Sequence, residues 1–252
     1  MQPPPLDLIG AALLFGAGYV SGVINVMAGG GSFLTIPALI FLGLPPTVAN
    51  ATNRVGVLLQ NVGGVYAFQR RGLLDWAVVR RGVPPALVGT VVGTWAATQV
   101  GDEAIKRVLA VLMVVMTVGP LVLHGSERTD EGGWRLRGVP LALAFVLVGA
   151  YVGFLQAGVG FIILSVTSAA GFDLVRGNAV KISVVFFLTA VSVAMFAWFG
   201  LIDWPRGLVL GLGNLLGGQL GVRLTLAAGH RWLRWVVTLA VLASAVKLWV
   251  SP

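Results

Sequence analysis

The chain has 252 residues, of which 57% are hydrophobic and only 10% charged, and its mean hydropathy is +0.93. A soluble domain carries roughly a quarter charged residues, so this composition excludes a soluble globular protein and predicts an all-α polytopic membrane protein. The net charge of +8 does not indicate nucleic acid binding, because the basic residues are scattered through short loops. The sequence has no cysteine, which excludes disulfides and thiolate metal sites.

Apolar segments alternate with turns that hold the nine carboxylates. Most segments have about 20 residues, the length that spans the hydrocarbon core of a bilayer. We predict five segments in each half of the chain: residues 6–27, 32–43, 48–69, 77–98 and 104–123, then 138–155, 160–171, 177–198, 205–226 and 232–250. Residues 124–137 predict a linker between two transmembrane repeats, 6–123 and 138–250.

The second half of the chain repeats the first at a spacing of 128 residues, without a gap. The string Gly72–Trp76 returns as Gly200–Trp204, and Asn50 returns as Asn178. Internal repeats in an apolar chain are typical of secondary transporters, in which the substrate binds where the two halves meet.

The second segment of each repeat is short. Residues 32–42 and 160–170 would form helices of about 16 Å, half the thickness of a bilayer. Glycines precede each segment, as Gly29–Gly31 and as Gly158 and Gly160. Paired short segments interrupted by glycine predict broken or re-entrant half-helices and point to the binding site.

The distribution of basic residues indicates the orientation of the repeats. If the short segments carry the chain across the membrane, the halves are inverted, with eleven basic residues on one side and four on the other. If the short segments re-enter, the division is nine to six. The positive-inside rule favours the first arrangement. We therefore expect inverted repeats in the cell inner (plasma) membrane, with both termini outside.

Polar residues share one face of the third segment of each repeat. That face carries Asn50, Asn53, Arg54 and Asn61 in the first half, and Asn178, Lys181 and Thr189 in the second. A charge within an apolar helix is costly and should face a cavity. Two other interpretations stay open: the cations snorkel to lipid headgroups, and the asparagines only cap or cross-link helices.

The glycine runs predict where an anion could bind. A helix that begins inside the membrane offers free backbone N–H groups and the positive end of its dipole, and glycine lets an anion approach closely. The alternative is that these glycines only let helices touch. We expect no carboxylate at mid-membrane, which argues against an acidic ion relay and against a cationic substrate. The sequence shows no catalytic, metal or cofactor motif, so we expect neither an enzyme nor a cofactor.

At these residues the chain resembles the TauE/SafE sulfite exporter (TSUP) family. The resemblance is carried by Gly22, Gly29–Gly31, Pro37, Gly43–Pro45, Ala49–Asn53 and Gly72–Asp75, together with the repeat spacing and the chain length. It implies a bacterial-type inner-membrane permease for sulfur-containing anions such as sulfite, thiosulfate and sulfoacetate. The chain departs from the family pattern at Gly158–Gly160, where the glycine motif is degraded, and at Lys181, where a small polar residue is more typical.

The residues and the resemblance predict the same mechanism, in which a small anion binds between the two half-helix starts while the halves rock to alternate access. The predicted substrate-binding residues are Gly30, Gly31, Ser32, Asn50, Asn53, Arg54, Asn61, Gly158, Gly160, Asn178, Lys181 and Thr189. The alternatives are an anion channel of the same fold, a permease for non-sulfur carboxylate anions, and a membrane enzyme or assembly scaffold. The sequence does not determine the exact anion, the direction of transport or the coupling ion. The oligomeric state also stays open, and a homo-oligomer is one possibility.

Overall fold

The computed structural model describes residues 4–27, 29–122, 138–169 and 174–227. These residues form nine helices: α1 Leu8–Met27, α2 Ser32–Phe41, α3 Pro46–Gln69, α4 Trp76–Gln99, α5 Asp102–Val122, α6 Val139–Phe154, α7 Val159–Ala169, α8 Leu174–Trp198 and α9 Trp204–Ala227. The prediction of an all-helical protein is therefore confirmed for the described residues, in which every regular element is a helix. The expected linker and the expected segment 232–250 lie outside the described residues.

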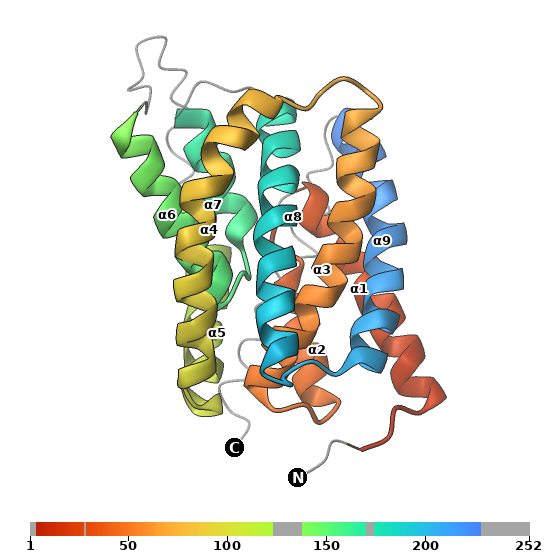
Figure 1. Cartoon of the computed structure of the whole chain (residues 1–252). Coiled ribbons are helices and arrows are strands. Elements are labelled where there is room, and N and C mark those ends of the chain that lie inside the picture. Colours follow the sequence, from red (N-terminus) through yellow and green to blue (C-terminus); the bar gives the residue numbers. More distant parts are fainter. Residues whose placement is uncertain (1–3, 28, 123–137, 170–173, 228–252) are drawn as a thin grey trace.

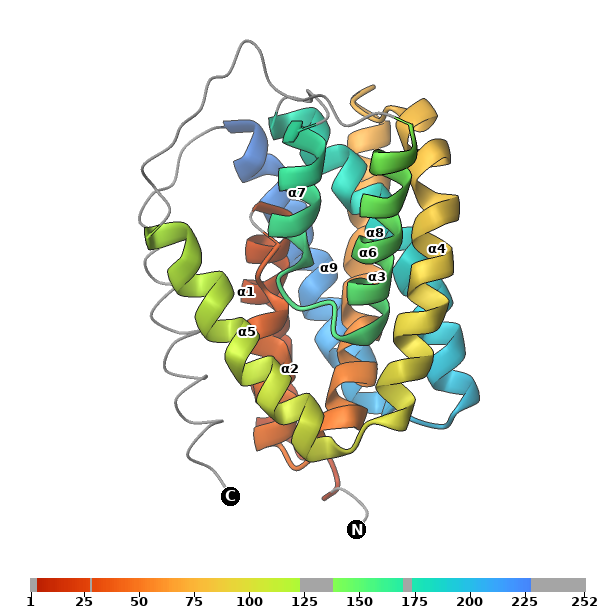
Figure 2. The same ribbon diagram turned by 90° about the vertical axis from the view of Figure 1, so that its left-hand side faces the viewer.

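The two short helices lie at opposite ends of the bundle. In Figure 1, α2 lies in the lower half and α7 in the upper half, and Figure 2 shows the same arrangement after a quarter turn. α1 runs upward from the N-terminal side, whereas its counterpart α6 runs downward (Figure 1). Each short helix begins in the interior of the bundle and turns back against the helix that precedes it.

The repeated string Gly72–Trp76 forms the same tight turn in both halves. Gly72 and Gly200 adopt positive φ angles of 65° and 67°, a conformation that glycine adopts without steric cost and that ends helices. The carboxylate of Asp75 accepts hydrogen bonds from the first backbone N–H groups of α4, and Asp203 does the same for α9. The string therefore ends one helix and caps the next.

Helices from different halves of the sequence form the closest packing. α1 packs along α9, and α4 packs along α6. Glycines make both crossings tight: a Cβ on Gly217 would lie 1.9 Å from the carbonyl oxygen of Tyr19, and a Cβ on Gly149 would lie 1.8 Å from that of Ala86. Such contacts between small residues let helix backbones approach closely in a membrane.

The contacts therefore divide most of the helices into two bundles. The first bundle contains α1, α2, α3 and α9, and the second contains α4, α6, α7 and α8. Each bundle takes three helices from one half of the sequence and a fourth from the other half. α3 and α8 pack against each other where the bundles meet, near the centre of Figure 1.

Length and hydropathy alone distinguish few of these helices from those of a soluble protein. Among the described helices, Leu8–Met27 and Val175–Trp198 are long and apolar enough to cross a membrane, while Ser32–Phe41 and Val139–Phe154 are apolar but shorter. α3 is less apolar because it carries a row of buried polar side chains, including Asn50, Asn53 and Arg54.

Replacing Gly149 with alanine should destabilise the protein, because the added methyl group would collide with the backbone of α4. Overpacking of this kind costs about 1–3 kcal/mol. The matched control is Gly16→Ala on α1, where a Cβ would meet nothing within 4 Å. Thermal unfolding of both variants in detergent tests this packing, and equal unfolding temperatures would contradict it.

Candidate substrate-binding site

The two helix breaks meet in the interior of the molecule. Gly29, just before α2, adopts a φ angle of +88°, and a Cβ placed on it would lie 2.2 Å from the Cα of Gly160 in the first turn of α7. Only glycine fits such a contact between backbones. The starts of the two half-helices therefore lie next to each other.

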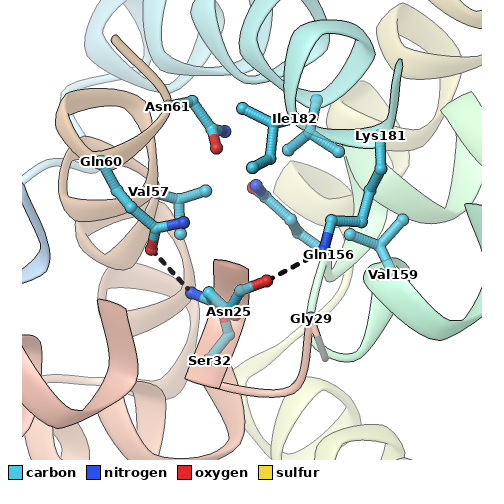
Figure 3. A pocket seen from close by; sticks show the side chains of 12 residues that line it. Asn25, Gly29, Ser32, Val57, Gln60, Asn61, Gln156, Val159, Lys181 and Ile182 are labelled. Atoms are coloured by element: carbon cyan, nitrogen blue, oxygen red, sulfur yellow. Dashed lines mark hydrogen bonds between the residues drawn. The ribbon is translucent and has the colours of Figure 1, made fainter. Parts of the chain in front are cut away.

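A small cavity lies beside this contact, between the two bundles (Figure 3). Its volume is about 20 Å³, enough for about one water molecule. The first bundle contributes Asn25, Gly29, Ser32, Val57, Gln60 and Asn61, and the second contributes Gln156, Val159, Gly160, Lys181, Ile182 and Val185. The lining thus contains several amides and one cation, and none of the lining residues is a carboxylate.

Lys181 of α8 is the charged residue of this lining, and it is only 3% exposed. Its Nζ donates to the backbone oxygens of Asn25 and Val26, at 3.1 and 3.0 Å. Those oxygens belong to the last turn of α1, where helical carbonyls lack partners and the helix dipole favours a cation. An ammonium group has three donors, so two of them hold the end of α1.

Arg54 of α3 is fully buried but does not line the cavity. Its guanidinium donates to the backbone oxygens of Val152 and Gly153, at 2.5 and 2.7 Å, and to Oε1 of Gln156 at 3.0 Å. The ring of Phe196 lies 4.9 Å from its central carbon. Arg54 thus caps the last turn of α6, as Lys181 caps that of α1, and neither cation is placed to snorkel to headgroups.

Asn50 and Asn178 form a second pair of reciprocal caps. The Nδ2 group of Asn50 donates to the carbonyl oxygen of Phe154, at the end of α6, over 2.9 Å. The Nδ2 group of Asn178 donates to the carbonyl oxygen of Val26, at the end of α1, over 2.8 Å. Both the donors and the acceptors occupy equivalent positions of the repeat. Each half of the chain therefore caps the broken helix of the other half, which agrees with the capping interpretation of the asparagines.

The structure brings four of the twelve predicted binding residues to the cavity: Ser32, Asn61, Gly160 and Lys181. The others lie outside its lining. Asn53 cross-links α3 to α2 through Ser32 and Thr35, Thr189 accepts from Gln156, and the N–H of Gly31 donates to Oδ1 of Asn25 at 2.7 Å. Gly30 and Gly158 lie in the two breaks without lining the cavity.

Three polar residues of the lining are absent from the predicted binding residues: Asn25, Gln60 and Gln156. Asn25 joins the end of α1 to α3 through a hydrogen bond from its Nδ2 to Oε1 of Gln60, at 3.2 Å. Gln156 lies in the second break with a φ angle of +63° and links Arg54 to Thr189. Polar residues in an apolar segment near mid-membrane are themselves a signal of a functional site. That signal could have identified Asn25 and Gln60, whereas Gln156 lies between the predicted segments 138–155 and 160–171.

Comparison with known proteins agrees with this architecture. The model of the family described as "Sulfite exporter TauE/SafE" matches residues 14–248. The chain belongs to this family. This family consists of membrane transporters, so the protein is a membrane transporter, as the resemblance in the sequence predicts.

Relatives of this family match over nearly their full length. A "Probable membrane transporter protein" of Haemophilus influenzae is 30% identical over 96% of this chain and 95% of its own. The Sinorhizobium sp. protein "Probable membrane transporter protein ORF9" is 29% identical, over 96% and 93%. "Probable membrane transporter protein YfcA" of Escherichia coli (strain K12) is 28% identical, over 94% and 88%. No solved structure matches the chain significantly.

Replacing Arg54 with methionine should destabilise the folded protein, because it removes three hydrogen bonds and leaves the end of α6 without its cation. Hydrogen bonds to charged groups contribute about 1.5–3 kcal/mol each, so the unfolding temperature in detergent should fall clearly. Arg54→Lys should recover only part of the loss, because one ammonium group cannot reproduce the guanidinium fork.

The control for Arg54 is Arg107→Met on α5. Its side chain is 71% exposed and, among the described residues, pairs with Glu103, 2.8 Å away, so its removal should change stability little. If Arg54→Met proved as stable as Arg107→Met, the capping role of Arg54 would be refuted.

Proposed function

We propose that this protein is a secondary transporter of small sulfur-containing anions, such as sulfite, thiosulfate or organosulfonates, and that it works by alternating access between two inverted repeats. The observation that carries the proposal is Lys181, a buried cation in a cavity whose lining has no carboxylate, at the meeting point of two half-helix starts. A cation with amide donors suits an anion and repels a cation.

The paths of the helices support inverted repeats. α1 and α6 occupy equivalent positions of the repeat and run in opposite directions, and α2 and α7 lie in opposite halves of the bundle (Figure 1). Inverted repeats of this kind give a transporter two related conformations, open to opposite sides. The distribution of basic residues in the loops favours the same arrangement, with both termini outside.

The size and position of the cavity support a binding site whose walls move apart when the substrate binds. A volume of about 20 Å³ is smaller than a sulfur oxyanion needs, so binding requires the walls to separate. The cavity lies between the two bundles, and the glycine crossings hold each bundle together. The bundles can therefore separate at the α3–α8 contact while each stays packed.

Replacing Lys181 with methionine should weaken anion transport at least tenfold, which corresponds to about 1.4 kcal/mol, because the anion then loses its only charged partner in the cavity lining. Lys181→Arg keeps the charge and should retain part of the activity. Uptake of labelled thiosulfate and sulfite into proteoliposomes measures the effect. Arg107→Met serves as the matched control, since it removes an exposed cation. Unchanged uptake by Lys181→Met would refute the site.

A carrier and a channel of this fold differ in their kinetics. In a carrier, each anion moves with one conformational cycle, so unlabelled thiosulfate inside the vesicles should accelerate entry of labelled thiosulfate, and the rate should saturate. Counterflow measured in proteoliposomes tests this expectation. Single-channel currents in a planar bilayer, without counterflow, would favour the channel instead.

A further inference from the structure

Four exposed arginines gather where α3 is joined to α4, and we call them the basic turn: Arg70, Arg71, Arg80 and Arg81. Among the described residues, none of the four pairs with a carboxylate. Asp75, the carboxylate within this segment, instead caps the start of α4. The basic turn therefore carries four positive charges that the described part of the chain does not balance.

The conformation of the turn does not explain these charges. The second repeat forms the same turn between α8 and α9, with Gly200 at a positive φ angle and Asp203 as the cap. Arg206 is the cation of that turn, and it is buried and pairs with Asp203 at 2.5 Å. The positions equivalent to the four arginines are apolar there: Trp198, Phe199, Leu208 and Val209. The same backbone thus forms without any exposed arginine.

The two turns face opposite sides of the membrane. Figure 1 shows the connection between α3 and α4 at the upper end of the molecule and the connection between α8 and α9 at the lower end. In a protein that spans a bilayer, these ends meet different leaflets. The four charges are therefore presented to one leaflet, and the matching apolar turn is presented to the other.

Exposed apolar side chains lead along both helices to the basic turn. On α3, Tyr66 is exposed one turn before Arg70. On α4, Val88 and Trp95 are exposed and follow Arg81 at intervals of seven residues, which places all three on one face. In a membrane helix, such apolar faces contact the acyl chains of lipids. Each face thus joins a surface for acyl chains to an arginine at its polar end.

A hydrogen bond between side chains holds the ends of α3 and α4 together. Nε1 of Trp76, the first residue of α4, donates to Oε1 of Gln69, the last residue of α3, over 2.8 Å. Tryptophan is enriched at the level of the lipid headgroups, where its ring meets lipid and its N–H meets polar groups. The bond therefore keeps the two pairs of arginines close to each other at the depth of the headgroups.

The arginines retain donors for a ligand. Arg71 donates to the carbonyl oxygen of Ala67 at 2.9 Å, and Arg80 donates to that of Trp76 at 3.2 Å. Each bond orients a side chain along its own helix and uses only part of a guanidinium that has five donors. The planar fork of a guanidinium matches the oxygens of a phosphate group. Clusters of basic residues beside a membrane helix attract anionic lipids in this way.

We propose that the basic turn binds the headgroup of an anionic phospholipid, whose acyl chains lie along the exposed faces of α3 and α4. The phosphate supplies negative charge that the turn lacks, and the chains cover the apolar side chains below it. Because α3 belongs to the first bundle and α4 to the second, the bound lipid contacts both bundles. This site is separate from the cavity, so the inference is independent of which anion the protein transports.

Two phospholipids with the same chains provide matched probes: dioleoyl phosphatidylglycerol, whose headgroup has a net negative charge, and dioleoyl phosphatidylcholine, whose headgroup has none. Native mass spectrometry of the purified full chain in a neutral detergent gives the Kd of the first lipid bound. We expect phosphatidylglycerol to bind at least tenfold more tightly. The combined substitutions Arg70→Gln, Arg71→Gln, Arg80→Gln and Arg81→Gln should make the two affinities equal.

Pairs of substitutions show whether both helices contribute. Arg70→Gln with Arg71→Gln, and Arg80→Gln with Arg81→Gln, should each remove part of the preference, because each pair removes half of the charge. These double variants also carry the test if the fourfold variant does not fold. The matched control, Lys106→Gln with Arg107→Gln, removes two cations near the start of α5 and should keep the preference.

A soluble headgroup separates a lipid site from a site for dissolved anions. Glycerophosphoglycerol has the headgroup of phosphatidylglycerol without its chains, so it should compete for the site at least tenfold more weakly than the lipid does. Thiosulfate, added at the same concentration, should not displace the lipid. If either compound displaces phosphatidylglycerol as well as the lipid itself does, the basic turn binds dissolved anions and the lipid assignment is wrong.

The remaining outcomes also decide the inference. Equal binding of the two lipids by the wild-type protein would refute it, and so would a full preference in the variants of the basic turn. If the control pair on α5 loses as much preference as those variants, the net charge of the protein attracts the lipid and the assigned site is wrong. Each of these failures leaves the proposed transport untouched, because uptake by the Lys181 variants tests that separately.

Discussion

The hydrogen bonding of two helix ends inside the molecule determines the rest of this structure. A helix that ends in a membrane leaves carbonyl groups that neither lipid nor water can satisfy. Here the ends of α1 and α6 are satisfied by Asn178 and Lys181, and by Asn50 and Arg54. Because each donor comes from the other half of the chain, neither break can be capped by one half alone. The duplication therefore supplies the partners that make a broken helix possible.

These caps also explain why the cavity lies where the two bundles meet. Each cap reaches from α3 or α8 across the bundle boundary, so this boundary is rich in polar groups among the described residues. The α1–α9 and α4–α6 crossings, by contrast, are tight contacts between glycine and backbone. The cavity thus lies at the contact of α3 and α8, where we propose that the two bundles separate.

The sequence predicted the periodic features well and the tertiary ones poorly. The repeat, the two half-helices and the turn at Gly72 could be recognised because each depends on local residue patterns. The polar face of residues 50–61 was identified, but helical periodicity cannot tell which neighbour each side chain meets. Arg54 therefore turned out to hold α6, whereas Lys181 faces the cavity. Asn25 and Gln156 lie at helix ends, where no periodic pattern marks them, and their partners are 35 and 102 residues away.

The departures from the repeat account for this difference between the two cations. Lys181 is equivalent to Asn53, and Arg54 is equivalent to Ile182. A shift of one residue turns a side chain by about 100° around its helix. Two cations at equivalent positions would have produced either a cavity with two charges or a cavity with none. The single-residue offset instead leaves one cation at the cavity and commits the other to the end of α6, so duplication provides the scaffold and divergence provides the charge of the site.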